Sequence, residues 1–143
     1  CTSSTNCTQC QTAYFVDGGL CATCLYSCLT CDNPINCTSC NSSDFRQLNP
    51  NTSQCDPMDG YFDDGTNNSM TQPCDLICIT CSGSPTYCTS CPNDTYYLLN
   101  GSCNLCNSTL VGCITCNDVT TCTSCESAYF LMNQTCGSCL YSC

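Results

Sequence analysis

The segment CITCNDVTTCTSC, from Cys113 to Cys125, contains the pattern on which this chain is built. It places two Cys-x-x-Cys pairs close together, one with Thr before its second cysteine and one with Thr and Ser between its cysteines. Pairs of these two types recur as CTQC at Cys7, CLTC at Cys28, CITC at Cys78, and CTSC at Cys37, Cys88 and Cys122. Such internal repetition is typical of proteins that use one small structural unit several times.

An aromatic residue follows each CTSC or CTQC pair, and a turn-forming stretch and another cysteine come next. In one copy, Tyr96–Leu99 (YYLL) suits a strand, and Asn100-Gly101 is a strong hairpin-turn signal. No segment shows the 3.6-residue periodicity of a helix. We therefore predict a small disulfide-rich repeat fold. Its tandem short β-hairpin modules would stack into an elongated rod with little or no helix and a minimal hydrophobic core.

The cysteine pattern divides the chain into four modules. We place them at 1–27 (partial at its start), 28–77, 78–112 and 113–143, the last completed by a following copy. Their uneven lengths come mainly from one acidic insertion, residues 56–73, in the second module.

The amino-acid composition indicates the cellular compartment of the protein. Of 143 residues, 24 are Cys and none is Trp or His, and the other apolar residues are scattered, so cross-links must replace a core. So many cysteines become oxidised only along a secretory route, which predicts an extracellular protein, secreted or on the cell surface. No stretch approaches 18 apolar residues, and the chain does not begin with Met. We expect no direct membrane insertion. We also expect the chain to be a mature fragment or part of something longer.

Nine Asn-x-Ser/Thr sequons, more than this composition gives by chance, agree with that compartment. We predict N-linked glycans at these sites and no cofactor. The sequons begin at Asn6, Asn36, Asn41, Asn51, Asn67, Asn93, Asn100, Asn107 and Asn133.

The charged residues exclude several functions. The net charge is −10, with Arg46 as the single basic residue, which excludes nucleic-acid binding by phosphate neutralisation. The chain has no His or Lys, no Gly-x-Ser-x-Gly motif and no phosphate loop, and a coreless fold desolvates carboxylates poorly, so we predict no enzyme activity. The Cys-x-x-Cys pairs are too many and too alike for zinc quartets or for one redox-active pair.

The insertion holds a weak candidate for a calcium site, because Asp56, Asp59, Asp63 and Asp64 offer hard oxygen donors. Their spacing departs from the register of a calcium-binding loop. We therefore predict a solvated acidic loop without metal.

The motif C-x-x-C-x5-6-C-T-S-C-x3-5-[YF]-x-L-x-C-x-x-C resembles the furin-like, growth-factor-receptor-type cysteine-rich repeat over essentially the whole chain. The Ser, Thr and Asn between cysteines resemble the surface repeat proteins of ciliates and other protists. In the furin-like family, hairpin modules carry one disulfide and intervening modules carry two crossed ones. The resemblance implies hairpin bonds Cys10–Cys21, Cys40–Cys55, Cys91–Cys103 and Cys125–Cys136, and crossed bonds Cys24–Cys31, Cys28–Cys37, Cys74–Cys81, Cys78–Cys88, Cys106–Cys116 and Cys113–Cys122.

Four cysteines remain, and they lie at the two ends. CLYSC at 139–143 repeats CLYSC at 24–28, and Cys1 and Cys7 are spaced as Cys31 and Cys37 are. This matched phase predicts bonds between copies, Cys139–Cys1 and Cys143–Cys7, in a head-to-tail homopolymer or tandem array. Pairing of the four within one folded-back chain stays open as an alternative.

The sequence thus predicts an extracellular structural glycoprotein, the head-to-tail repeat unit of a filament or surface coat. A ligand-binding or adhesive receptor-like ectodomain, which would need an exposed apolar patch with glycans absent from one face, is the alternative. A variable surface antigen would share the same physical features.

Overall fold

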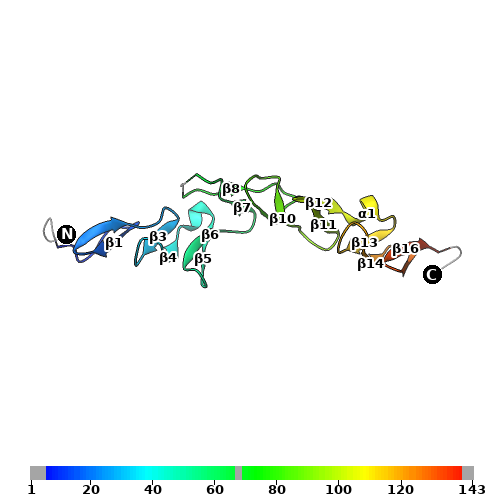
Figure 1. The fold of residues 1–143 in the computed structure, drawn as a ribbon, viewed down its shortest axis with the longest axis horizontal. Helices are drawn as coiled ribbons and strands as arrows, with labels where there is room; N and C mark the ends of the chain where they lie inside the picture. The colour runs from blue at the N-terminus through cyan, green and yellow to red at the C-terminus, as the bar shows by residue number, and fades with distance from the viewer. Residues whose placement is uncertain (1–5, 67–68, 140–143) are drawn as a thin grey trace. The chain divides into compact units, whose positions relative to one another are not determined.

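A computed structural model describes residues 6–66 and 69–139, and the chain divides into two compact units, Cys1–Gln72 and Pro73–Cys143. Every sheet among the described residues has two strands. Figure 1 draws these short strands as arrows along the chain. The predicted class of disulfide-rich tandem hairpins with little helix is confirmed. The module boundaries predicted from the cysteine pattern stay predictions.

The first unit is a succession of hairpins, each made by neighbouring strands. The pairs are β1 (Tyr14–Asp17) with β2 (Leu20–Thr23), β3 (Cys28–Cys31) with β4 (Cys37–Cys40), β5 (Arg46–Asn49) with β6 (Gln54–Pro57), and β7 (Tyr61–Phe62) with β8 (Gln72–Pro73), whose last residue begins the second unit. A 3-10 turn, η1 (Ser42–Asp44), follows Asn41, whose side-chain oxygen accepts a hydrogen bond from the Ser43 amide at 3.2 Å.

The second unit repeats this plan. Its pairs are β9 (Thr80–Cys81) with β10 (Cys88–Ser90), β11 (Tyr96–Leu99) with β12 (Ser102–Leu105), β13 (Cys113–Cys116) with β14 (Cys122–Cys125), and β15 (Tyr129–Met132) with β16 (Thr135–Ser138). One helical turn, α1 (Cys106–Thr109), connects the second pair to the third.

Three hairpins close through two-residue turns in which both central residues have positive φ. The angles are 50° and 76° at Asn100-Gly101, 47° and 65° at Asn133-Gln134, and 55° and 83° at Gly18-Gly19. Positive φ at both positions defines the type I′ turn, whose twist matches that of the strands it joins. The turn predicted at Asn100-Gly101 is therefore present.

Half-cystines form the interior of each unit. One cluster joins Cys28, Cys31, Cys37 and Cys55, and the other joins Tyr97, Cys106, Cys113, Cys116 and Cys122. Sulfur is apolar and readily buried, so the cross-links also supply apolar contact that the scattered Leu and Ile residues do not.

Substitution of Gly101 tests how the hairpin turns pack against their neighbours. A Cβ at Gly101 would lie 2.4 Å from the Tyr87 ring, whereas a Cβ at Gly83 would meet nothing within 4 Å, and both residues have positive φ. We expect Gly83→Ala to cost about 1 kcal/mol, from backbone strain alone, and Gly101→Ala about 2–3 kcal/mol. Hydrogen exchange of the Cys88 amide, which donates to the Gly101 carbonyl, measures the difference. Equal effects of the two variants would contradict this packing.

Candidate functional site: the junctions between repeats

Disulfides cross-link the chain locally, within strand pairs and between neighbouring ones. Each of the ten bonds between described residues spans 7 to 15 residues, with Cα–Cα distances of 5.1 to 5.9 Å. Their members are Cys10–Cys21, Cys24–Cys31, Cys28–Cys37, Cys40–Cys55, Cys74–Cys81, Cys78–Cys88, Cys91–Cys103, Cys106–Cys116, Cys113–Cys122 and Cys125–Cys136. These are the ten pairs that the family resemblance implies.

The four cysteines at the ends are described only in part. Cys1 and Cys143 lie outside the described residues, while Cys7 and Cys139 are each disulfide-bonded. The pairs Cys139–Cys1 and Cys143–Cys7 between copies therefore stay a prediction.

A backbone hydrogen bond accompanies the cross-links at four equivalent junctions. The first cysteine of each CTSC or CTQC pair donates its amide to the last turn residue of the hairpin that follows, the residue directly before the second strand. The donor, acceptor and distance are Cys7 to Gly19 at 2.7 Å, Cys37 to Ser53 at 2.7 Å, Cys88 to Gly101 at 2.7 Å, and Cys122 to Gln134 at 2.8 Å. All four acceptors have positive φ, so each left-handed residue presents its carbonyl to the Cys-x-x-Cys pair that precedes its hairpin.

Hydroxyl groups link the two strands of each crossed module. The Thr of Cys-x-Thr-Cys lies between the Thr and Ser of Cys-Thr-Ser-Cys, within hydrogen-bonding distance of both. The three clusters are Thr30 with Thr38 and Ser39, Thr80 with Thr89 and Ser90, and Thr115 with Thr123 and Ser124, at O–O distances of 2.5 to 2.7 Å. The repeated Thr and Ser of the motif are thus cross-strand partners, a role that we did not predict from the sequence.

The hairpin of the second module, β5–β6, differs from three other hairpins in the residue that follows its second strand, where the insertion begins. In three hairpins the residue before the first strand accepts a hydrogen bond from a cysteine amide: Ala13 from Cys24, Thr95 from Cys106, and Ala128 from Cys139, at 2.9 to 3.0 Å. In the second module Phe45 accepts from Met58 at 2.8 Å. Met58 therefore occupies the position of a cysteine, and the next cysteine, Cys74, comes only after the insertion.

Arg46 occupies the position that is Tyr in the three hairpins β1–β2, β11–β12 and β15–β16. Strand register places Arg46 opposite Pro57, as it places Tyr14 opposite Thr23, Tyr96 opposite Leu105, and Tyr129 opposite Ser138. The single basic residue of the chain thus begins the hairpin that carries the insertion.

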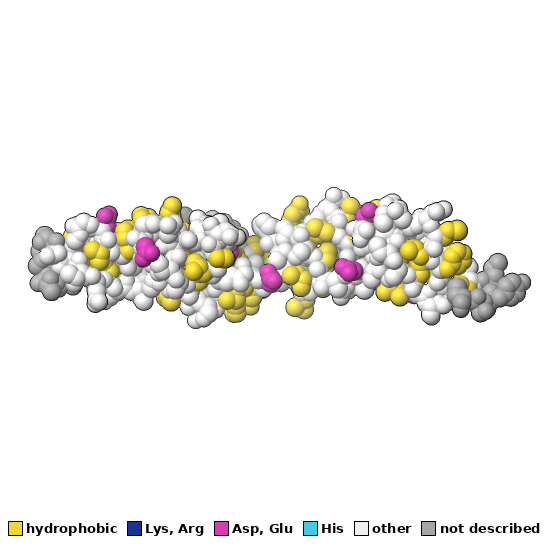
Figure 2. Space-filling model, turned by 90° about the horizontal axis from the view of Figure 1, so that it is seen from below, with side chains coloured by type: hydrophobic (Ala, Val, Ile, Leu, Met, Phe, Trp, Pro, Cys, Tyr) yellow, Lys and Arg dark blue, Asp and Glu magenta, His cyan; other side chains and the backbone are white. Residues whose placement is uncertain are grey.

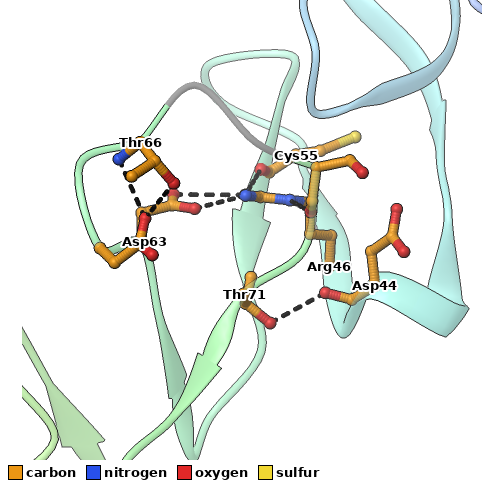
Figure 3. Close-up of polar contacts among 8 residues, drawn as sticks. Asp44, Arg46, Cys55, Asp63, Thr66 and Thr71 are labelled. Atoms are coloured by element: carbon orange, nitrogen blue, oxygen red, sulfur yellow. Dashed lines mark hydrogen bonds and ion pairs between the residues drawn. The ribbon is translucent and has the colours of Figure 1, made fainter.

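Arg46 is 2% exposed and fastens the insertion to this hairpin (Figure 3). Its guanidinium donates to the Ser69 carbonyl at 2.7 Å, to the Cys55 carbonyl at 3.0 Å, and to both carboxylate oxygens of Asp63. Its Cζ atom lies over the Tyr26 ring, 5.7 Å from the ring centroid. A buried arginine is tolerated because these acceptors replace the water that it loses.

Apolar contacts also hold the insertion, so the predicted solvated loop is wrong for much of its length. The Tyr61 ring stacks on Phe45 with centroids 4.1 Å apart, Phe62 is 5% exposed, and buried Thr71 donates to the Asp44 carbonyl at 2.9 Å. The prediction rested on the acids of this segment and left out its aromatic residues.

The four aspartates proposed as weak calcium ligands have different partners. Asp63 accepts hydrogen bonds from Arg46, and Asp56 accepts one from the side-chain amide of Asn49 at 2.7 Å. Asp64 accepts from the hydroxyl and the backbone amide of Thr66, which hold the pKa of its carboxyl below the usual value. Asp59 is exposed. Among the described residues, no three of these carboxylates bring ligand atoms together.

Most sequon asparagines lie at the surface. Asn6, Asn36, Asn51, Asn93, Asn100, Asn107 and Asn133 are exposed, Asn41 is half-buried, and Asn67 lies outside the described residues. Two asparagine amides already have carboxylate partners: Asn41 donates to Asp44 and Asn107 to Glu126, each at 3.1 Å. The exposed asparagines leave room for the predicted glycans.

Hydrophobic side chains are dispersed over the face of the molecule drawn in Figure 2, rather than gathered in one patch. Exposed apolar residues occur in both units, for example Leu20 and Met70 in the first and Leu105 and Phe130 in the second. Within the described residues, no helix is long and apolar enough to cross a bilayer.

Replacement of Arg46 tests its hold on the insertion. Arg46→Tyr introduces the residue of the other three hairpins, so we expect β5–β6 to persist while Tyr61, Phe62 and Thr71 lose about 2 kcal/mol of protection, roughly a thirtyfold faster amide exchange. Asp64→Asn, in the same segment but bonded to Thr66, is the matched control and should change little. Unchanged exchange in Arg46→Tyr would show that the stacked aromatic residues suffice.

Comparison with known proteins identifies relatives of this chain. No protein-family model matches it, and no solved structure does so significantly. It is 34% identical over 124 residues to cysteine repeat modular protein 1 of Tetrahymena thermophila, covering 85% of this chain. It is 31% identical over 144 residues to furin-like protease 2 of Drosophila melanogaster, covering 87% of this chain. It is 30% identical over 140 residues to the human extracellular matrix organizing protein FRAS1, covering 94% of this chain.

The chain spans only 5%, 8% and 3% of the lengths of these three relatives, respectively. The match to the protease falls in its cysteine-rich repeat region. The relatives and the ten disulfides together indicate an extracellular or cell-surface location. With its hairpins, its crossed cysteine pairs and these relatives, the chain belongs to the furin-like cysteine-rich repeat proteins.

Proposed function

We propose that this chain is a structural segment of an extracellular filament or surface coat and has no catalytic role. In this proposal its modules continue head to tail, as a homopolymer of subunits or as a tandem array, and N-linked glycans cover them. The observation that carries the proposal is the repeated junction, in which a disulfide and a backbone hydrogen bond from cysteine to turn recur at successive modules.

A repeated junction supports a mechanical role because it lets modules be added without a new kind of contact. Each disulfide closes a loop of at most 15 residues, so outside the insertion little chain can be drawn out under tension while the bonds are intact. The relatives are far longer than this chain, and one of them bears the name cysteine repeat modular protein. A long series of modules is therefore the form that we propose.

The distribution of apolar residues favours this role over that of a ligand-binding ectodomain. A specific binding surface needs a contiguous desolvated centre. The exposed apolar residues of this chain are distributed over both units. Exposed sequons in both units would also place glycans beside any such surface.

Mass analysis of native material, with and without reductant, tests the array. We expect large disulfide-linked species that reduction converts to single chains, with peptides that join Cys139 to Cys1 and Cys143 to Cys7 of another copy. For one long polypeptide, peptides should instead continue through these positions into further repeats. If all the bonds lie within one 143-residue chain and no repeat flanks it, the array is wrong.

A further inference from the structure

Two disulfides of the second unit lie in direct contact. Cys113–Cys122 joins β13 to β14, and Cys125–Cys136 joins β14 to β16. The Sγ atoms of Cys122 and Cys136, which belong to different bonds, are 3.2 Å apart. Within the described part of the chain, Cys113, Cys122 and Cys136 form the only group of three potential ligand residues whose atoms all lie within 4.8 Å of one another.

The strand register allows a second way to pair these four cysteines. Cys113 lies opposite Cys125 in the β13–β14 ladder. Residues directly opposite in an antiparallel pair have Cα atoms about 4.5–5.5 Å apart, within the range that a disulfide spans. Cys113–Cys125 can therefore form without movement of the strands, and the sulfur contact already places Cys122 within reach of Cys136.

Burial distinguishes the two existing bonds. Cys113 and Cys122 are 1% and 2% exposed, whereas Cys125 and Cys136 are half-buried. Cys125–Cys136 is therefore the more accessible of the two bonds to a thiol from solution. Since Cys136 contacts Cys122, attack on the outer bond places a thiolate beside the inner one.

We propose that Cys113, Cys122, Cys125 and Cys136 form a thiol-reactive site, at which a small thiol catalyses exchange between two disulfide pairings. The thiolate attacks Cys125 Sγ, forms a mixed disulfide there and releases Cys136 as a thiolate. Cys136 attacks Cys122, forms Cys122–Cys136 and releases Cys113. Cys113 then attacks Cys125, forms Cys113–Cys125 and expels the small thiolate.

The exchange conserves both electrons and cross-links. Two disulfides enter and two leave, and the small thiol is regenerated, so no oxidant or net reductant is needed. In the second pairing, Cys136 of β16 is tied to Cys122 rather than Cys125, which moves the attachment of the last hairpin along β14. Part of the chain can thus change its covalent junction while staying fully cross-linked.

The first unit provides the matched control. Cys28 also lies opposite Cys40 in the β3–β4 ladder, so the register there would permit the same alternative, with Cys37 joined to Cys55. Those four cysteines form no group of three with sulfur atoms within 4.8 Å. The sulfur contact between disulfides, rather than the register, is therefore what distinguishes the site.

A pair of double variants tests the proposal. Cys113→Ser with Cys125→Ser removes the native partners of Cys122 and Cys136, and Cys28→Ser with Cys40→Ser does the same for Cys37 and Cys55. Each secreted variant is denatured without reductant, alkylated with N-ethylmaleimide and weighed as an intact chain. Relative to the unaltered protein, we expect no added label on the first variant, because Cys122 and Cys136 pair, and two added labels on the second. Two added labels on the first variant, or none on either, would overturn the proposal.

A measurement on the unaltered chain serves if a variant fails to fold. The protein is incubated with reduced glutathione at mildly alkaline pH, quenched with acid and digested, and linked peptides are assigned by fragmentation mass spectrometry. Peptides joining Cys122 to Cys136 should increase with glutathione concentration, while peptides joining Cys37 to Cys55 should not. Absence of the first pair at every thiol concentration would also overturn the proposal.

Discussion

Disulfides between near neighbours in sequence constrain everything else in this molecule. With sequence separations of 7 to 15 residues, each bond removes conformational freedom from one small segment of the unfolded chain, a gain of roughly 2–4 kcal/mol per bond. Two-stranded hairpins are marginal on their own in water, so the cross-links make them persistent. The same sulfur atoms form the buried clusters, and the chain can therefore do without a conventional core.

This local construction explains how one module can differ without disturbing the others. In the second module Met58 replaces a cysteine, Arg46 replaces a tyrosine, and an insertion follows. The equivalent cysteine, Cys74, comes only after the insertion, which contains no cysteine. The insertion is held instead by the buried Arg46, which binds Asp63, Ser69 and Cys55, and by the stacking of Tyr61 on Phe45. Neighbouring modules keep the same junction, because their bonds do not pass through the insertion.

The sequence predicted the parts of this fold that depend on neighbouring residues. The Cys-x-x-Cys pairs, the aromatic residues and Asn100-Gly101 indicated hairpins, because a turn and its strands lie in one short segment. Connectivity came only from the family resemblance, since cysteine spacing alone permits many pairings. The partnership of Arg46 with Asp63 joins residues 17 apart and was missed. The available signal was one arginine standing where the other copies have tyrosine. The contact between Cys122 and Cys136 depends on three-dimensional packing, and no sequence pattern predicted it.

Hydrogen exchange before and after reduction tests most directly whether cross-links rather than a core hold this protein. The chain would be fully reduced and alkylated at neutral pH without denaturant, and amide exchange compared with that of the oxidised protein. We predict that protection of the hairpin amides, including Cys37, Cys88 and Cys122, falls to the level of an unfolded chain. Hairpins that remained protected after loss of every disulfide would contradict this view of the fold.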